Sequence, residues 1–282
     1  MKKKNIGSIA FRRTIAYIVL VFFSILCLFW FLLLFINSTR SNGELAGGFT
    51  LIPSRFFLIN MKNVLTGSLP VVKGMWNSFV IAALSSILTV YFSTMTAYAL
   101  TVYRFKGRTS VLTFILAIMM IPTQVSALGF VNLVGNLGLE DSFIPLIVPA
   151  IASPITFFYM KQYMSANLPI SLIEAARIDG AGEFKTFNMV TIPLMKPAIA
   201  VQMIFAFVAS WNNYFIPSLI LYRDDKKTLP ILIAQLRAAD YLKFDLGQVY
   251  AMIAFSIFPV IVVYLFLSKY IVGGVTAGGV KE

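Results

Sequence analysis

The sequence predicts an all-α integral membrane protein that crosses a lipid bilayer six times. Of its 282 residues, 59% are hydrophobic and only 12% are charged, whereas a soluble domain carries about 25% charged residues. Six runs without Asp, Glu, Lys or Arg are long enough to cross a hydrocarbon core, which takes about 20 apolar residues as a helix. A chain this apolar also excludes intrinsic disorder.

The six expected spans are residues 14–36, 76–103, 109–130, 142–160, 198–222 and 246–268. The first follows a basic segment, residues 1–13, and is longer than the apolar part of a cleaved signal peptide, about 7–15 residues. The third is expected to end near Phe130, before the turn-like sequence GNLGLED. The fourth contains Pro145, Pro149 and Pro154, so we expect it to be bent or broken.

Lysine and arginine indicate the orientation, because cytoplasmic loops carry an excess of both. With the N-terminus inside, 14 of the 23 cations lie in the inner segments 1–13, 104–108, 161–197 and 269–282, and 9 lie in the outer segments. We therefore expect both termini in the cytoplasm. The cations form short clusters between apolar runs instead of a stripe on one polar face, so the net charge of +12 does not indicate nucleic-acid binding.

The chain lacks side chains that several other functions need. It has no His, and no expected span holds a charge, which argues against a proton-coupled carrier. A sodium-coupled carrier stays open, although such carriers commonly show two matching halves and no internal repeat is evident here. The pattern G-x-x-x-x-G-K-S/T, which cradles nucleotide phosphates, is absent. We expect no ATP hydrolysis, catalytic residue, metal or cofactor in this chain.

The inner segment 161–197 is too long for a simple connection, since most connections take about 4–6 residues. Ser171 and Glu174 have the spacing of a capping box at a helix start, and Gly180 is placed to end that helix. Leu172, Ile173, Ala175, Ala176 and Ile178 would give it an apolar face. A helix below about 12–15 residues is marginal alone, so we expect it to bind a partner.

Within this segment, Glu174-Ala175-Ala176, then Gly180, then Val190-Thr191-Ile192-Pro193 resemble the EAA loop of ATP-binding-cassette (ABC) importer permeases. Val190 and Ile192 depart conservatively from the family's Ile and Leu. The longer stretch EAARIDGAGEFKTFNMVTIPLMKP is similar to the carbohydrate branch of that family, as are MIPTQV and SWNNYFIPSLIL. The resemblance implies the type I ABC importer permease fold for residues 14–268.

The resemblance also implies an assembly in the plasma membrane of a prokaryote. This chain would form half of the pore, with a second and different permease as the other half. Two ATPase subunits would bind ATP and Mg, and an extracytoplasmic binding protein would deliver a carbohydrate. The residues implied to contact the ATPase are Glu174, Ala175, Ala176, Arg177, Asp179, Gly180 and Ala181. The tail 273–282 resembles members whose C-terminus reaches into the ATPase dimer, or it is a frayed terminus.

Polar and aromatic side chains in the spans are the candidates for a substrate pathway. The fifth span holds Trp211, Asn212, Asn213 and Tyr214, and the weaker candidates are Gln124 and Gln202. Buried amides are costly unless they face a cavity or each other, so hydrogen bonding between helices is the alternative. Another solute, such as glycerol phosphate or a polyamine, stays open. The outer segments 37–73 and 223–245 could contact a binding protein, and LPILIAQL in the second predicts partial folding.

Overall fold

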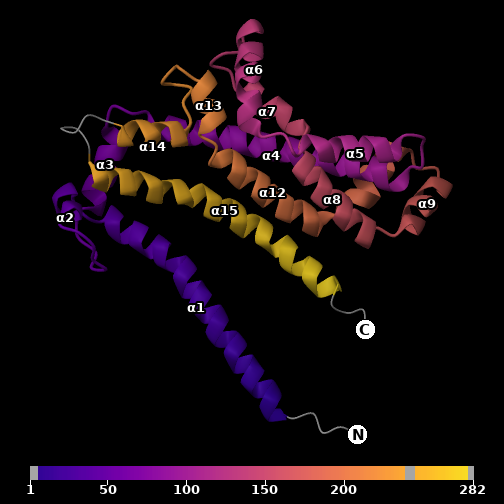
Figure 1. The fold of residues 1–282 in the computed structure, drawn as a ribbon, viewed down its shortest axis with the longest axis horizontal. Helices are drawn as coiled ribbons and strands as arrows, with labels where there is room; N and C mark the ends of the chain where they lie inside the picture. Colours follow the sequence, from indigo (N-terminus) through magenta and orange to yellow (C-terminus); the bar gives the residue numbers. More distant parts are fainter. Residues whose placement is uncertain (1–5, 239–244, 279–282) are drawn as a thin grey trace. The chain divides into compact units, whose positions relative to one another are not determined.

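The computed structural model describes residues 6–238 and 245–278, and the chain is helical with no strand in these ranges (Figure 1). The helices are α1 (Ile6–Ser38), α2 (Asn42–Ala46), α3 (Phe57–Thr66), α4 (Val71–Val102), α5 (Arg108–Ile118), α6 (Thr123–Asn136), α7 (Ile144–Ile147), the 3-10 helix η1 (Val148–Ile151), α8 (Pro154–Asn167), α9 (Ile170–Ile178), α10 (Glu183–Thr186), the π-helix η2 (Phe187–Thr191), α11 (Ile192–Leu194), α12 (Lys196–Trp211), α13 (Phe215–Ile220), α14 (Leu229–Arg237) and α15 (Leu246–Gly278). They form two compact units. Unit 1 is Met1–Ser68 with Gln235–Ser256, and unit 2 is Leu69–Ala234 with Ile257–Glu282.

Four segments of the described chain are long and apolar enough to cross a membrane as they stand. They are Phe11–Ser38, Val71–Val102, Ile144–Asn167 and Leu246–Ile271. Two bent helix pairs, α5 with α6 and α10–α11 with α12, bring the number to six if each pair is one span. The membrane-protein class is therefore confirmed, while the six individual spans stay predictions.

The third expected span, 109–130, is not a continuous helix. The chain bends by 93° between α5 and α6. Pro122, which precedes α6, has an extended backbone (φ −63°, ψ 129°). Proline lacks an N–H and disfavours helical geometry in the residue before it, so the first helix stops short of Pro122. Charge-free length alone does not show this break.

The fourth expected span is broken into short helices, whereas the last is one helix that is longer than expected. Pro145, Pro149 and Pro154 start or interrupt α7, η1 and α8, so the broken helix expected there is present. In contrast, α15 runs past the expected end at residue 268 to Gly278. The tail is helical as far as that residue, and residues 279–282 lie outside the described ranges, as do Lys2, Lys3 and Lys4 of the basic N-terminal segment.

In unit 2, α4 is the central helix and packs against α7, η1, α8 and α12. Its buried side chains are mostly small, with Ser, Thr and Ala at the contacts. Small residues let helix backbones approach closely in a membrane. The hydroxyls of Ser86 and Thr94 donate to carbonyls within α4, those of Ala83 and Val90, at 3.0 and 2.6 Å. The α4 stripe is therefore both tightly packed and hydrogen-bonded.

In unit 1, a side-chain amide ties the end of α1 to α3. Asn60 is 3% exposed, and its Nδ2 donates to the carbonyls of Ser38 and Arg40 at 3.0 and 2.9 Å. Gly247, at the start of α15, lies against this amide and the Arg40 carbonyl. The Leu246 N–H donates to Asn42 Oδ1 at 3.1 Å. The start of the last helix thus contacts α2, α3 and the residues just after the first helix in this unit.

The segment after α13 folds onto α4, as its apolar LPILIAQL piece predicted. Leu229 and Leu232 of α14 are fully buried. The side-chain amide of Asn77 donates to the carbonyls of Asp225 and Lys227, both at 3.0 Å, and Ser78 Oγ accepts the Leu229 N–H at 2.8 Å. These bonds fix residues 225–229 on the first turns of α4.

Candidate coupling loop and substrate pathway

The helix that carries Glu174 begins earlier than expected. The residue at its N-cap is Pro169, with an extended backbone and no side-chain capping bond. The Leu172 N–H donates to the Pro169 carbonyl at 3.2 Å. Ser171 therefore already lies inside the first turn of α9, and the predicted capping box with Glu174 is wrong. The fixed φ of Pro169 suits a helix start without help from a serine hydroxyl.

The helix α9 ends just before Gly180, as the sequence predicted. Gly180 has a left-handed backbone, with φ +77°. Its N–H donates to the Arg177 carbonyl at 3.0 Å, and the Ala181 N–H donates to the Ala176 carbonyl at 2.9 Å. This is a Schellman motif, which closes the last turn of a helix and favours glycine at the left-handed position. The chain turns sharply there toward α10.

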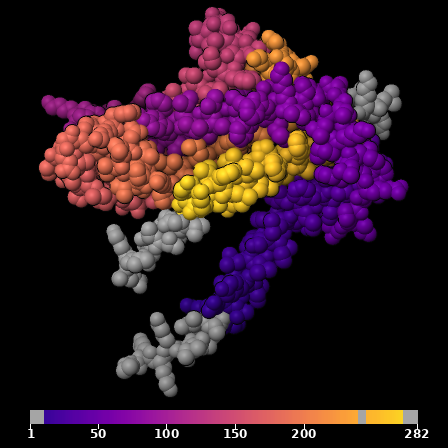
Figure 2. All heavy atoms as spheres, turned by 180° about the vertical axis from the view of Figure 1, so that it is seen from behind, coloured from indigo at the N-terminus to yellow at the C-terminus, as the bar shows by residue number. Residues whose placement is uncertain are grey.

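Only one apolar side chain of α9 is anchored in the protein. Ile173 is 0% exposed and belongs to the core between α4, α8 and α9, whereas Ile178 is 86% exposed. Glu174, Ala175 and Asp179 are exposed as well. The expected apolar face is therefore largely open to the outside, and Phe184 and Met189 continue it beyond α9. Such a patch is typical of a surface that another protein covers. Figure 2 shows this part of unit 2, coloured salmon to orange, as a protruding lobe.

Arg177 forms an ion pair within the chain with Glu183, a residue that the sequence did not single out. Arg177 Nε lies 2.7 Å from Glu183 Oε1. The other carboxylate oxygen, Oε2, accepts the hydroxyls of Tyr98, at 3.0 Å, and Tyr103. The hydrogen bond from Arg177, then that from Tyr103, lowers the pKa of Glu183 to about 2. The same bond raises the pKa of Arg177. Sequence spacing gave no signal, because the tyrosines are about 80 residues away.

The polar residues of the fifth expected span lie where the helix ends instead of in its middle. The helix α12 stops at Trp211, and α13 begins at Phe215, so residues 198–222 are not one continuous helix. Trp211 is 3% exposed and stacks on Phe207 at 5.8 Å between ring centroids. Asn212 is the exposed C-cap of α12.

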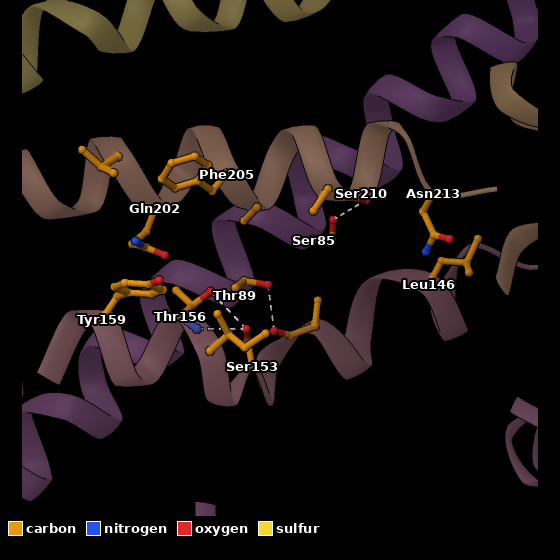
Figure 3. Close-up of a pocket in the computed structure, with 15 residues that line it drawn as sticks. Ser85, Thr89, Leu146, Ser153, Thr156, Tyr159, Gln202, Phe205, Ser210 and Asn213 are labelled. Atoms are coloured by element: carbon orange, nitrogen blue, oxygen red, sulfur yellow. Dashed lines mark hydrogen bonds between the residues drawn. The ribbon is translucent and has the colours of Figure 1, made fainter. Parts of the chain in front are cut away.

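Two of the six expected pathway residues line a cavity of about 660 Å³. Gln202 of α12 and Asn213, which lies two residues after the end of α12, face this cavity (Figure 3). Tyr214, Gln124, Trp211 and Asn212 are not among its lining residues. The structure thus brings Gln202 and Asn213 together and leaves the other four elsewhere.

Hydroxyls that the sequence reasoning missed form much of the wall. Ser85 donates to Ser210 at 2.9 Å, and Thr89 donates to the Ala150 carbonyl at 2.8 Å. Tyr159 of α8 points toward Gln202 of α12 across the cavity (Figure 3). The run of Ser and Thr in α4 was the available signal, but only helix packing shows which of them reach the cavity.

Three polar side chains of the cavity wall make no hydrogen bond within the described part of the chain. Among the residues that the structure describes, no side-chain partner exists for the amides of Gln202 and Asn213 or for the Tyr159 hydroxyl. Gln202 is only 7% exposed, and it lines the cavity. No lining residue is charged. The cavity therefore offers donors, acceptors and aromatic surface to a neutral polar molecule.

Membrane-length helices, a cavity between them and an exposed helical loop are typical of a membrane-embedded subunit of a transport machine. The chain belongs to the family described as the inner membrane component of binding-protein-dependent transport systems, which residues 89–276 match. The importer-permease resemblance is thus confirmed. This membership favours an importer permease over the alternative of a sodium-coupled carrier.

Relatives and a solved structure agree with the family. The chain is 36% identical, over 92% of both chains, to the arabinooligosaccharides transport system permease protein AraQ of Bacillus subtilis. It is 31% identical to the trehalose/maltose permease protein MalG of Thermococcus litoralis, over 96% of this chain and 97% of that one. A bacterial ABC transporter that imports the polysaccharide alginate contains a chain with a TM-score of 0.74 and 23% identity, covering 96% of this chain and 99% of that one. The expected type I importer permease fold is thereby confirmed.

Proposed function

We propose that this chain forms half of the pore of an ATP-driven importer for a neutral oligosaccharide. The observation that carries the proposal is the cavity between α4, α8 and α12, whose lining mixes apolar side chains with hydroxyls and amides and contains no charged residue. Sugars present many hydroxyls and apolar ring faces, which amides and aromatic rings match. Gln202 and Asn213 supply free amides, and Tyr159 and Phe205 supply rings.

The absence of charge from the lining favours a neutral sugar over the other candidate solutes. A phosphate group is bound preferentially by Arg or Lys, and a polyamine needs carboxylates. The lining residues include neither. Relatives named for arabinooligosaccharides and for trehalose and maltose support the same choice.

We infer that the energy comes from separate ATPase subunits, which would dock on α9 and on the apolar side chains exposed beside it. A different permease would form the other half of the pore, and a binding protein would deliver the sugar on the side opposite the loop. Glu174, which has no intrachain partner among the described residues, is free to pair with a basic group of the ATPase. Both termini would lie on the ATPase side.

The cavity is tested by uptake into proteoliposomes that contain the assembled importer with its binding protein. Gln202→Leu should lower uptake of a labelled trisaccharide about two- to tenfold, because one hydrogen-bonding amide contributes about 0.5–1.5 kcal/mol. Gln124→Leu, the same change at an exposed site outside the cavity, should leave uptake within about twofold. Equal effects, or uptake of glycerol phosphate or spermidine but of no saccharide, would contradict the proposal.

The coupling role is tested separately. Glu174→Arg should abolish ATP hydrolysis stimulated by the loaded binding protein, because it places a cation opposite a basic partner. Membrane insertion should be unchanged. Purification of the wild-type chain from native membrane with no nucleotide-binding subunit would refute the ATPase assembly itself.

A further inference from the structure

The exposed loop is fastened to the end of α4 by one carboxylate. One carboxylate oxygen of Glu183 accepts a hydrogen bond from Arg177, and the other accepts hydrogen bonds from the hydroxyls of Tyr98 and Tyr103. The Arg177 guanidinium lies 5.5 Å from the Tyr103 ring centroid, within the range of a cation–π contact. Because Arg177 is in the last turns of α9 and both tyrosines belong to α4 or its C-cap, Glu183 joins the two elements.

Further contacts between α4 and the loop lie two helical turns nearer the start of α4. The Tyr91 hydroxyl donates to Asn188 Oδ1 at 3.2 Å. The rings of Tyr91 and Tyr98 pack on Phe187 with centroids 5.6 and 5.5 Å away. Residues seven apart lie on one face of a helix, so this face of α4 holds the segment from α10 to η2 along two turns.

The same helix forms a wall of the cavity. Thr89, next in line on α4, donates to the Ala150 carbonyl, and Ser85 donates to Ser210 of α12. At 1.5 Å per residue, Tyr98 and Thr89 are separated by about 13 Å along the helix axis. One rigid helix therefore touches both the loop and the cavity.

The loop has two covalent routes to the cavity, through α8 before α9 and through α12 after α11. The second is poorly suited to transmit a displacement. The chain leaves α11 and enters α12 with a bend of 83°. A sharp bend lets the two segments change their angle, whereas a continuous helix moves as one body. The noncovalent connection to α4 has no such break, because α4 is uninterrupted from Val71 to Val102.

We propose that Glu183 is a positioning residue that makes the loop move together with α4, so that a displacement of α9 reaches the cavity through α4. The inference rests on the proposed coupling of α9 to an ATPase. It assigns to Glu183, Tyr98 and Tyr103 a role in energy transfer without any contact to ATP or sugar. Without them, hydrolysis would continue while the cavity no longer responds.

The experiment measures sugar uptake and ATP hydrolysis in the same proteoliposomes, with a labelled trisaccharide as the probe. Tyr98→Phe/Tyr103→Phe removes two hydroxyl donors and keeps both rings, including that of Tyr98, which packs on Phe187. Glu183→Gln removes the charge and keeps the shape. Tyr222→Phe is the matched control, because its hydroxyl also donates a hydrogen bond, to the Leu219 carbonyl, away from the loop.

The expected result is a split between the two activities. Uptake should fall about fivefold or more, as for a typical coupling free energy, while stimulated hydrolysis changes less than about twofold. The ATP consumed per sugar therefore rises in both variants and stays unchanged in Tyr222→Phe.

Three outcomes would overturn the proposal: parallel loss of both activities, loss of the ATPase subunits from the purified complex, or an unchanged ratio. A wild-type complex whose hydrolysis does not respond to sugar would instead contradict the proposed function.

Discussion

Gly247 is a position where adding one methyl group should destabilise unit 1. A Cβ atom there would lie 2.6 Å from the Arg40 carbonyl oxygen and 2.8 Å from Asn60 Nδ2. The first neighbour is backbone and the second is the amide that holds α1 to α3. Neither can move without losing the bonds from Asn60 to Ser38 and Arg40.

The magnitude follows from these contacts. Overpacking a closely packed site costs about 1–3 kcal/mol, and each hydrogen bond lost from Asn60 costs about 1 kcal/mol. Against this, alanine is favoured over glycine in a helix by at most about 1 kcal/mol. We expect Gly247→Ala to lower the free energy of unfolding by about 2–4 kcal/mol, or the Tm by about 5–10 °C.

The control is Gly129→Ala in α6, where an added Cβ meets nothing within 4 Å. The same substitution should leave the Tm unchanged or raise it slightly, because only helix propensity acts. Thermal unfolding of the purified chain, followed by tryptophan fluorescence, measures both variants. Equal Tm values for the two would refute the close approach of Gly247 to Asn60.

Three further predictions concern single residues. Asn77→Leu should speed hydrogen exchange in residues 225–229 about tenfold, because it removes both amide bonds that fix them; unchanged exchange would contradict the anchoring. Gly180→Ala should cost about 1–2 kcal/mol, since its φ is +77° with free space around it, and should fray the end of α9. The stabilising bonds of Glu183, whose pKa falls from 4.5 to about 2, should be fully present above about pH 4.5 and lost as the pH falls toward 2. The Tm difference between wild type and Glu183→Gln should shrink over that interval, and a constant difference would count against it.

Features set by local chemistry were predictable from the sequence. Gly180 was expected to end α9 because few other residues adopt its backbone conformation, and the apolar piece at 229–236 was expected to fold because it had no reason to stay in water. The membrane class followed from charge-free length. Each of these depends on a short stretch of chain.

Features set by packing were not predictable. The break after Trp211 falls inside an uninterrupted charge-free run, where Asn212 and Asn213 were expected to line a pathway. Glu183 looks like any exposed acid. The partners of Glu183 come from another helix, and only the packing of α4 against the loop brings them near. The wrong capping box has a local cause instead. Two residues that can start a helix, Pro169 and Ser171, lie two positions apart, and the helix starts after the proline.

The contact between the start of α15 and the segment that follows α1 in unit 1 has a consequence for how the protein is made. Leu246 and Asn42, which are hydrogen-bonded, are 204 residues apart in the chain. At about 5–20 residues per second, a ribosome needs about 10–40 s to synthesise the chain between them. During that time α1 and α3 lack the start of α15. Biogenesis therefore includes an interval in which the N-terminal helix is inserted but its unit is incomplete, and any truncation before Leu246 should leave this intermediate exposed to quality-control proteases.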